Sequence, residues 1–596
     1  LTTSEVSMAA AAVTVTDAAT FANANTINGF TNGQVTLNVV KDTVANIESI
    51  NGLTTSEVSI AAAAITVTDA VNLDNATAIN GFTTGQVTLQ NVQDSYANIQ
   101  FIDAITESEL TMSSSDITVT DQVNFVKINT LANQTSLSNV ITVNDVADTK
   151  MLLAITKGNS RVLLNKADIT VSDDVSKADA DTINTYNDVS GTVTLTSITD
   201  NFTNVVAAQG TAGIAMTAAT IETDNTEAVT KANVDTLNGF TTGVVTVKSV
   251  SDTVSNITSI DTISDSEVLM SSAIVTVTDG ASLTNANAIN KMTSGKVTLN
   301  AVKDTKDNVL SILELNPNEV TMANATATIT SAISLSETNT VNEVISGKVT
   351  LNSVEDSYSN IQLIKDINTA EVDMEAAAIK VTDSVNKTKV DDLRTDTTGD
   401  ITLTSITEDS ADLATIAAFT DVSLSTANIT VSDDVSKAQA DTIDAYSNTS
   451  GTVTLTSITD TVSNVTAVNT NTNISIASAA VTVTDAASLA DATAINGFTN
   501  AQVTLNSVKD TVSNITSIDL IDSNEVSMAA AAVTVTDPAS LADATAINGF
   551  TNAQVTLNSV EDSYANIQDI KKIDDAQVNM GAAAVKVSDN VTKTEV

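Results

Sequence analysis

The stretch VTVTDAASLADATAINGFTNAQVTLNSVKDTVSNITSI, from Val481 to Ile518, decides the fold of this chain because it is repeated. It recurs almost verbatim from Val533 and recognisably from Ile65 and Val13. Copies follow one another at a spacing of about 52 residues through all 596 residues. A fixed period of this length predicts a stack of supersecondary units, each of which buries its apolar face only against its neighbours.

Each repeat divides into a longer and a shorter half that follow one scheme. An alternating apolar stretch leads to an acidic residue, here called the pivot acid, and apolar residues then recur at every third position. The structural unit is therefore a half-repeat of 24 to 28 residues, and the chain holds about 23 of them. Glu408 takes the pivot position in one unit and Ser331 in another.

The pivot acid marks the expected start of a helix. Pro538 follows Asp537, and an acid followed by proline is typical of an N-cap with proline at the first helical position. The apolar residues after it are Leu541, Ala544 and Ile547. The same reasoning predicts a structural cap at each pivot acid, for example at Asp17, Asp42, Asp69, Asp485, Asp510 and Asp537.

Glycine is the expected end of the longer helices. Asn548-Gly549 would stop the helix with glycine in the left-handed conformation, and Phe550 would contact the helix behind it. Gly29 and Phe30 repeat this pattern near the start of the chain.

The strands are predicted from alternation. Val503 and Leu505 flank Thr504, which makes one side of the segment apolar and the other hydroxylated, as in a half-buried strand. The run 529–532 is polyalanine and is expected to form a tight corner or a close-packed strand.

These elements predict a mainly β fold with short helices, a parallel β-solenoid with about 23 rungs. Residues 1–596 are expected to form a single continuous solenoid of about 11.5 tandem repeats, with no separate domains and with both ends falling within repeats. A leucine-rich-repeat-like α/β solenoid and a string of small β-sandwich domains are the alternatives. The sandwich string is disfavoured because a 52-residue unit buries little surface.

Composition narrows the classes of function. The net charge is −47, from 72 acidic and 25 basic residues, and this charge repels nucleic acids and anionic membranes. No apolar run is long enough for a membrane span. Without histidine or cysteine there is no Ser-His-Asp triad, cysteine nucleophile or imidazole-based zinc site, so no enzymatic activity is expected.

Calcium is the candidate cofactor, because stacked carboxylates repel unless they cap backbone or bind a hard cation. Capping needs only one acid per unit. The extra acids Asp174, Asp434 and Glu561 are therefore the candidate calcium ligands.

An asparagine ladder accompanies the shorter units, four residues after the pivot acid. Its amides are expected to bond to backbone in the adjoining rung or loop. The residues are Asn46, Asn98, Asn204, Asn256, Asn308, Asn360, Asn464, Asn514 and Asn566.

The ITVTD and VTVSD strands, the D-x-x-x-N-I segment and the Thr/Ala/Asn/Val-rich composition resemble the repeat tracts of giant bacterial surface proteins, including those of marine cyanobacteria and other large adhesins. The resemblance implies secretion and a place on the bacterial cell surface or in the extracellular matrix. We therefore expect a structural extracellular fibre or surface-coat protein that acts as a stiff spacer. The alternatives are a calcium-dependent surface-layer protein or adhesin, and a phage or contractile-device fibre. The expected partner is the chain itself, joined end to end or laterally, with a surface glycan or the cell wall as a candidate partner.

Overall fold

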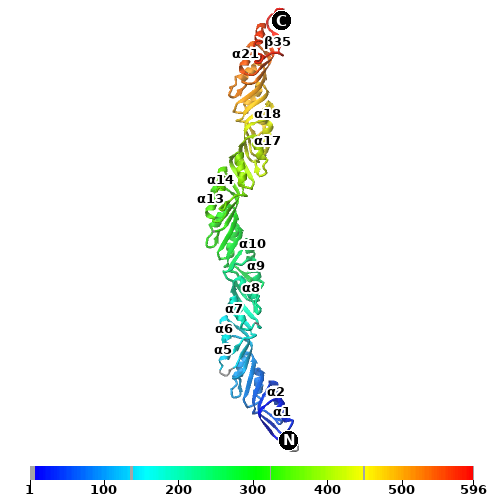
Figure 1. The fold of residues 1–596 in the computed structure, drawn as a ribbon, viewed down its shortest axis with the longest axis vertical. Coiled ribbons are helices and arrows are strands. Elements are labelled where there is room, and N and C mark those ends of the chain that lie inside the picture. The colour runs from blue at the N-terminus through cyan, green and yellow to red at the C-terminus, as the bar shows by residue number, and fades with distance from the viewer. Residues whose placement is uncertain (1–6, 135–138, 189, 323, 448–449, 595–596) are drawn as a thin grey trace. The chain divides into compact units, whose positions relative to one another are not determined.

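The computed structural model describes residues 7–134, 139–188, 190–322, 324–447 and 450–594. Parallel strands alternate with short helices along the chain (Figure 1). Two compact units are present, one formed by residues 1–279, 284–299 and 316–321, and the other by residues 280–283, 300–315 and 322–596. The first and last residues of the chain, where the ends were predicted to fall within repeats, lie outside the described residues.

Short helices follow the strands in every repeat. Those in the described residues are α1 (Phe21–Asn28), α2 (Val44–Asn51), α3 (Leu73–Asn80), α4 (Tyr96–Asp103), α5 (Phe125–Asn133), α6 (Lys150–Gly158), α7 (Lys177–Asn184), α8 (Phe202–Gln209), α9 (Lys231–Asn238), α10 (Val254–Asp261), α11 (Leu283–Met292), α12 (Lys306–Leu313), α13 (Leu335–Val344), α14 (Tyr358–Lys365), α15 (Lys387–Asp396), α16 (Ser410–Ala417), α17 (Lys437–Ser447), α18 (Val462–Thr470), α19 (Leu489–Asn496), α20 (Val512–Asp519), α21 (Leu541–Phe550) and α22 (Tyr564–Ile570).

The strands fall into three sets. Those of the longer halves are β1 (Val13–Ala19), β4 (Ala64–Val71), β7 (Asp116–Val123), β10 (Asp168–Val175), β13 (Thr220–Thr223), β17 (Ile274–Ala281), β20 (Thr326–Ile333), β23 (Ala378–Val385), β26 (Asn428–Val435), β29 (Ala480–Ala487), β32 (Ala532–Ala539) and β35 (Ala584–Val587). Those of the shorter halves are β2 (Val35–Asp42), β5 (Val87–Asp94), β8 (Ile141–Asp148), β11 (Val193–Asp200), β14 (Val245–Thr246), β15 (Ser249–Asp252), β18 (Val297–Asp304), β21 (Val349–Asp356), β24 (Ile401–Glu408), β27 (Val453–Asp460), β30 (Val503–Asp510) and β33 (Val555–Asp562). Two-residue strands precede the longer ones: β3 (Val58–Ser59), β6 (Leu110–Thr111), β9 (Val162–Leu163), β12 (Ile214–Ala215), β16 (Val268–Leu269), β19 (Val320–Thr321), β22 (Val372–Asp373), β25 (Val422–Ser423), β28 (Ile474–Ser475), β31 (Val526–Ser527) and β34 (Val578–Asn579).

The strands form a 15-stranded and a 20-stranded parallel sheet in which neighbours follow chain order. In the strands of the longer halves, the pairing register shifts at the same place from repeat to repeat. Val15 pairs with Leu37 and Ala18 with Val39, so Thr16 and Asp17 face the single residue Asn38. This two-against-one arrangement is a β-bulge, which re-aims the side chain it carries. In the longer strands that show this shift, the pivot residue therefore leaves the ladder at a bulge.

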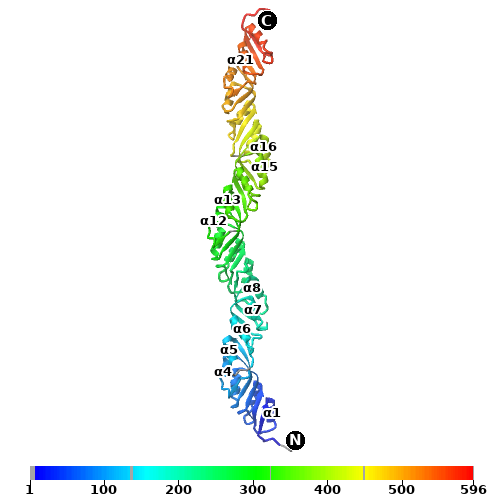
Figure 2. The ribbon, with the colours of Figure 1, turned by 60° about the vertical axis from the view of Figure 1, so that its left-hand side comes forward.

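The core lies between the helices and one face of the strands. In β2 the buried side chains are Val35, Leu37 and Val40, and in α2 they include Ile47 and Ile50. Figure 2 shows the helices aligned against the strands within each unit. Period-2 burial in the strand meets period-3 burial in the helix, as the sequence predicts.

In seven of the described longer halves a buried threonine, here called the threonine clamp, joins the loop after the helix to the turn before the strand. Thr83 Oγ1 donates to the Ala63 carbonyl at 2.7 Å and accepts from the Gly85 N–H at 2.9 Å. A Cβ on Gly85 would lie 2.4 Å from the Ala63 oxygen, so the loop and the turn approach each other closely at this residue. The hydroxyl-to-carbonyl bond recurs between Thr31 and Ala11, Thr241 and Ala219, Thr293 and Ala273, Thr397 and Ala377, Thr499 and Ala479, and Thr551 and Ala531.

The predicted helix start is wrong by three residues in the longer halves. Helix α21 has Ser540 as its N-cap, and Ser540 Oγ accepts from the Asp543 N–H in a capping box. Pro538 lies in β32, where its missing N–H is tolerated beside the bulge. A hydroxyl three residues from an acid is itself a strong start signal, and it outweighs the Asp-Pro pair.

The predicted helix end is also wrong. Gly29 caps α1 with φ −67° and ψ −13°, which is right-handed backbone open to any residue. Phe30 is 61% exposed and so gains no burial against the helix. Gly549 itself lies inside α21, which continues to Phe550.

The predicted fold class is confirmed. The chain is a repeat solenoid, mainly β with short helices, and its strands are parallel throughout the described pairings. The polyalanine corner is confirmed as well: the Ala531 N–H bonds to the Met528 carbonyl in a turn, and Ala532 opens β32.

Candidate functional site

The pivot acids bind the helix of the preceding half-repeat. Asp42 Oδ2 accepts from the Phe21 N–H of α1 at 2.7 Å, and Asp69 Oδ1 accepts from the Val44 N–H of α2 at 2.7 Å. In both pairs the donor is the first residue of the helix, whose N–H has no partner inside it. The pivot acid is thus a capping group, but for the neighbouring unit and not for its own.

This bond recurs along the described chain. It joins Leu73 to Asp94, Tyr96 to Asp121, Phe125 to Asp148, Lys150 to Asp173, Lys177 to Asp200, Lys231 to Asp252, Val254 to Asp279, Leu283 to Asp304, Leu335 to Asp356, Tyr358 to Asp383, Lys387 to Glu408, Ser410 to Asp433, Lys437 to Asp460, Val462 to Asp485, Leu489 to Asp510, Val512 to Asp537, Leu541 to Asp562 and Tyr564 to Asp589. Ser331 Oγ performs the same role for Lys306. Of the predicted caps, Asp17 accepts instead from Thr16 Oγ1 at 3.5 Å.

In the shorter halves that carry the ladder asparagine, the pivot carboxylate accepts three bonds. Asp510 accepts from the N–H groups of Leu489 and Thr511 and from Asn514 Nδ2, each at 2.8 Å. Burial alone would raise the pKa of Asp510, but these three donors together hold the pKa below its ordinary value. At Asp562 the N–H of Leu541 is the largest influence, and the pKa is lowered there too.

The asparagine ladder has a different partner from the predicted one. Asn46 Nδ2 donates to Asp42 Oδ1 at 2.8 Å, within its own unit, and not to backbone. The side chain lies one helical turn beyond the pivot acid, where its amide can complete the carboxylate's hydrogen bonding. The other eight asparagines make the same bond, to Asp94, Asp200, Asp252, Asp304, Asp356, Asp460, Asp510 and Asp562.

The three predicted calcium ligands lie in separate units and each has a protein partner. Ser197 Oγ donates to Asp174, and Ser457 Oγ donates to Asp434, both at 2.7 Å. Glu561 Oε1 lies 2.6 Å from Lys586 Nζ. The structure does not bring these residues together, and calcium binding by them stays a prediction.

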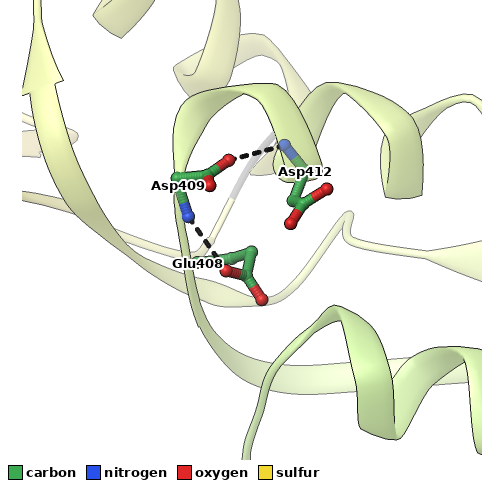
Figure 3. Close-up of side chains that lie close together, drawn as sticks. All are labelled: Glu408, Asp409 and Asp412. Carbon is green, nitrogen blue, oxygen red and sulfur yellow. Dashed lines mark hydrogen bonds between the residues drawn. The ribbon is translucent and has the colours of Figure 1, made fainter.

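One group of three carboxylates does gather in the described residues, at the start of α16. Oxygens of Glu408, Asp409 and Asp412 lie within 4.8 Å of one another (Figure 3). Asp409 is the N-cap, and its Oδ1 accepts from the Asp412 N–H at 2.8 Å. Glu408 Oε1 accepts from the Asp409 N–H at 3.2 Å and Oε2 from the Lys387 N–H at 2.8 Å.

This acid cluster is present because two residues of this shorter half differ from those of the other shorter halves. Glu408 stands at the pivot position, and Asp412 stands where most shorter halves carry the asparagine. A carboxylate cannot donate as the amide does, so Glu408 faces a second negative charge where Asp42 and its equivalents face an N–H donor. Three carboxylates at this spacing are suited to a hard cation with oxygen ligands.

The cluster also acts on a nearby lysine. The pKa of Lys387 is raised, chiefly by its hydrogen bond to Asp391 and further by the charges of Asp412 and Glu408. Sequence reasoning placed Glu408 at a pivot position but missed the cluster. The signal was the combination of Glu408 with Asp412, a break in the asparagine ladder.

None of the helices in the described ranges has both the length and the apolar character to cross a membrane. No protein-family model matches the chain, and no curated protein matches it in sequence. Its function is therefore proposed from its geometry, its charge and the character of its repeats.

Proposed function

We propose that this chain is a structural protein of the cell surface or extracellular matrix that acts as a stiff spacer. The observation that carries the proposal is the cap ladder, in which a pivot side chain binds the first helical N–H of the preceding half-repeat along most of the described chain. A unit that bends away from its neighbour breaks this bond as well as the strand pairing. In a repeat array each such contact couples a unit to its neighbour and adds to the stability of the stack, so bending at any one joint has to break it.

The chain contains no cysteine, so a pair of cysteines introduced by substitution can be spin-labelled without competing sites. Suitable positions are Ala45 and Ser255 in the first compact unit, and Ser359 and Ser513 in the second, since all four are exposed on helices. Each cysteine pair, labelled and measured by pulsed electron resonance, is expected to give one narrow distance distribution. Broad distributions for correctly folded protein would contradict a stiff spacer.

A surface location is supported by the resemblance of the repeats to bacterial surface proteins and by the large negative charge, which keeps a repeat array soluble. Antibodies raised against the chain are expected to label intact producing cells. Labelling only after the cells are permeabilised would place the protein inside and overturn this part of the proposal.

A calcium-dependent surface-layer protein or adhesin is the second candidate, and the acid cluster of Glu408, Asp409 and Asp412 favours it. Calcium is expected to raise the melting temperature of the wild-type chain, and a chelator to reverse the effect. In Asp412→Asn the amide replaces one ligand charge, so the calcium effect should shrink. An identical transition with calcium and with chelator would exclude this candidate.

A further inference from the structure

The outward face of most helices is built from small or polar residues, and large apolar side chains gather on this face at α5 and α6. The second and sixth residues of a helix point away from the core, and in α17 they are Ala438 and Thr442. In α5 and α6 these positions carry Val126, Met151 and Ile155, which are 65%, 65% and 50% exposed. We call these three side chains the apolar patch.

The surface around the apolar patch is hollowed. A hollow of about 180 Å³ lies between α5 and α6 and is lined by Phe125, Ile155 and Val162. Phe101 on α4 is also 63% exposed. Helix α4 adjoins α5, since Lys127 Nζ lies 5.4 Å from the centre of the Tyr96 ring. The patch thus offers a place for an inserted apolar side chain.

The charge of helices α5 and α6 is opposite to that of the whole molecule. Helices α5 and α6 contain no acidic residue but carry Lys127, Lys150 and Lys157. Lys150 is paired with Asp179, whereas Lys157 Nζ bonds to the uncharged Tyr186 carbonyl. Helices α5 and α6 are therefore basic on a chain whose net charge is −47. The acids that face Lys150 lie on other elements, Asp179 on α7 and Asp173 and Asp174 in β10.

A second unusual surface feature combines an exposed apolar side chain with acidic neighbours. Leu520, directly after α20, is 80% exposed, the highest value among the large apolar side chains of the described residues. Asp519 and Asp522 flank it, and both are exposed. At the equivalent place other repeats carry small or polar residues, such as Gly52 and Thr262. We call Leu520 with these two acids the acidic knob.

We propose that the acidic knob of one molecule docks on the apolar patch of a second copy. Leu520 would fill the hollow between α5 and α6, and the acids would face Lys127 and Lys157, which matches apolar to apolar surface and negative to positive charge. An anionic membrane is a poorer partner, because the rest of the chain repels it. Patch and knob are different surfaces, so the contact is heterologous and propagates from copy to copy into a closed ring or an open filament. The inference rests on the proposed function as an assembling structural protein and names its partner surface.

Complementation between two variants tests the contact. The patch variant carries Val126→Ser, Met151→Ser and Ile155→Ser, and the knob variant carries Leu520→Ser. In sedimentation velocity the wild type is expected to associate with rising concentration, and each variant alone to associate at least tenfold more weakly. An equimolar mixture of the two variants is expected to form dimers only, because one intact patch then meets one intact knob.

Leu363→Ser is the matched control, since Leu363 is 52% exposed on α14 and belongs to neither surface. It should associate like the wild type. Wild-type protein that stays monomeric, variants that associate unchanged, or a mixture that stays monomeric would each overturn the docking proposal. So would binding of the wild type, lost in the patch variant, to phosphatidylserine vesicles without self-association. The spin-label distances within one molecule do not depend on these outcomes, so failure of docking is distinguishable from failure of the spacer function.

Discussion

At the scale of the residue, the pivot carboxylates link one turn of the solenoid to the next. A short aspartate side chain can reach the start of a helix because of where the aspartate lies in its strand. Asp42 is the last residue of its strand, and Asp69 lies in a β-bulge. Carboxylate oxygens accept two or three bonds without competition from a donor of their own. The pivot acids resemble a row of potential binding sites. Most of their hydrogen-bonding capacity is already used by N–H groups of the protein.

Replacing Asp510 by Asn is expected to destabilise the chain locally. The introduced side-chain amide would place its NH2 group against a backbone N–H donor. Losing the charge-assisted hydrogen bonds lowers the free energy of unfolding by about 1.5 kcal/mol. Urea unfolding followed by circular dichroism should show a lower midpoint, and hydrogen exchange should quicken at the start of α19. Asp575→Asn, at an exposed acid, is the control and should leave both measurements unchanged.

Stability is expected to fall in acid. The pKa is lowered at Asp42, Asp252, Asp304, Asp356, Asp460, Asp510 and Asp562. A carboxyl group with a lowered folded-state pKa stabilises the protein fully above its unfolded-state pKa, and the contribution is lost as the pH falls through the folded-state value. Urea midpoints should therefore decline between about pH 5 and pH 2. A midpoint that stays constant over this range would contradict the cap ladder.

At the scale of the element, each helix and strand is held by contacts at its ends. A helix of eight residues is too short to be stable alone. Each helix is instead stabilised by a cap at its start and by apolar side chains on its inner face. In longer halves the threonine clamp also holds the loop that follows the helix. The clamp explains why Thr31, Thr83 and Thr241 lie buried with both hydrogen-bonding roles of the hydroxyl in use.

Thr83→Val is expected to weaken one such loop. The shape is retained, but the Ala63 carbonyl and the Gly85 N–H lose their partner in a buried place, at a cost of about 1–3 kcal/mol. The measurement is the urea midpoint with hydrogen exchange of the loop. Thr84→Val is the matched control, since Thr84 Oγ1 bonds to the Ala61 carbonyl at 3.0 Å in an exposed place. Equal effects of the two changes would argue against the clamp.

At the scale of the whole molecule, a net charge of −47 opposes compaction of the repeats. Scattered salt bridges such as Lys231–Asp235 at 2.7 Å are exposed and offset little of this repulsion. The parallel sheets and the buried apolar layer therefore have to outweigh it.

Added salt is accordingly expected to stabilise the chain. Raising sodium chloride from about 0.05 to 0.5 M shortens the screening length severalfold and weakens repulsion among the acids. The urea midpoint should rise with salt, and sodium sulfate at equal ionic strength controls for specific chloride effects. A midpoint that falls with salt would mean that attractive ion pairs dominate the electrostatics.

The sequence by itself determined the repeat, the strand and helix periods and the inner faces, because apolar residues such as Val503, Leu505 and Ile515 recur at spacings that only one local structure buries. It did not determine which helix each pivot acid caps. That choice depends on the register between turns, which places Asp69 beside Val44.

The tertiary structure alone decided three further points. It put Pro538 in a strand beside a bulge, joined each ladder asparagine to a carboxylate, and brought Glu408, Asp409 and Asp412 together. Each of these rests on hydrogen bonds or distances set by three-dimensional packing, which the spacing of residues along the chain does not specify. The hydrophobic pattern is local and repeats, whereas the partner of a polar group is whichever donor the stacked turn brings within reach.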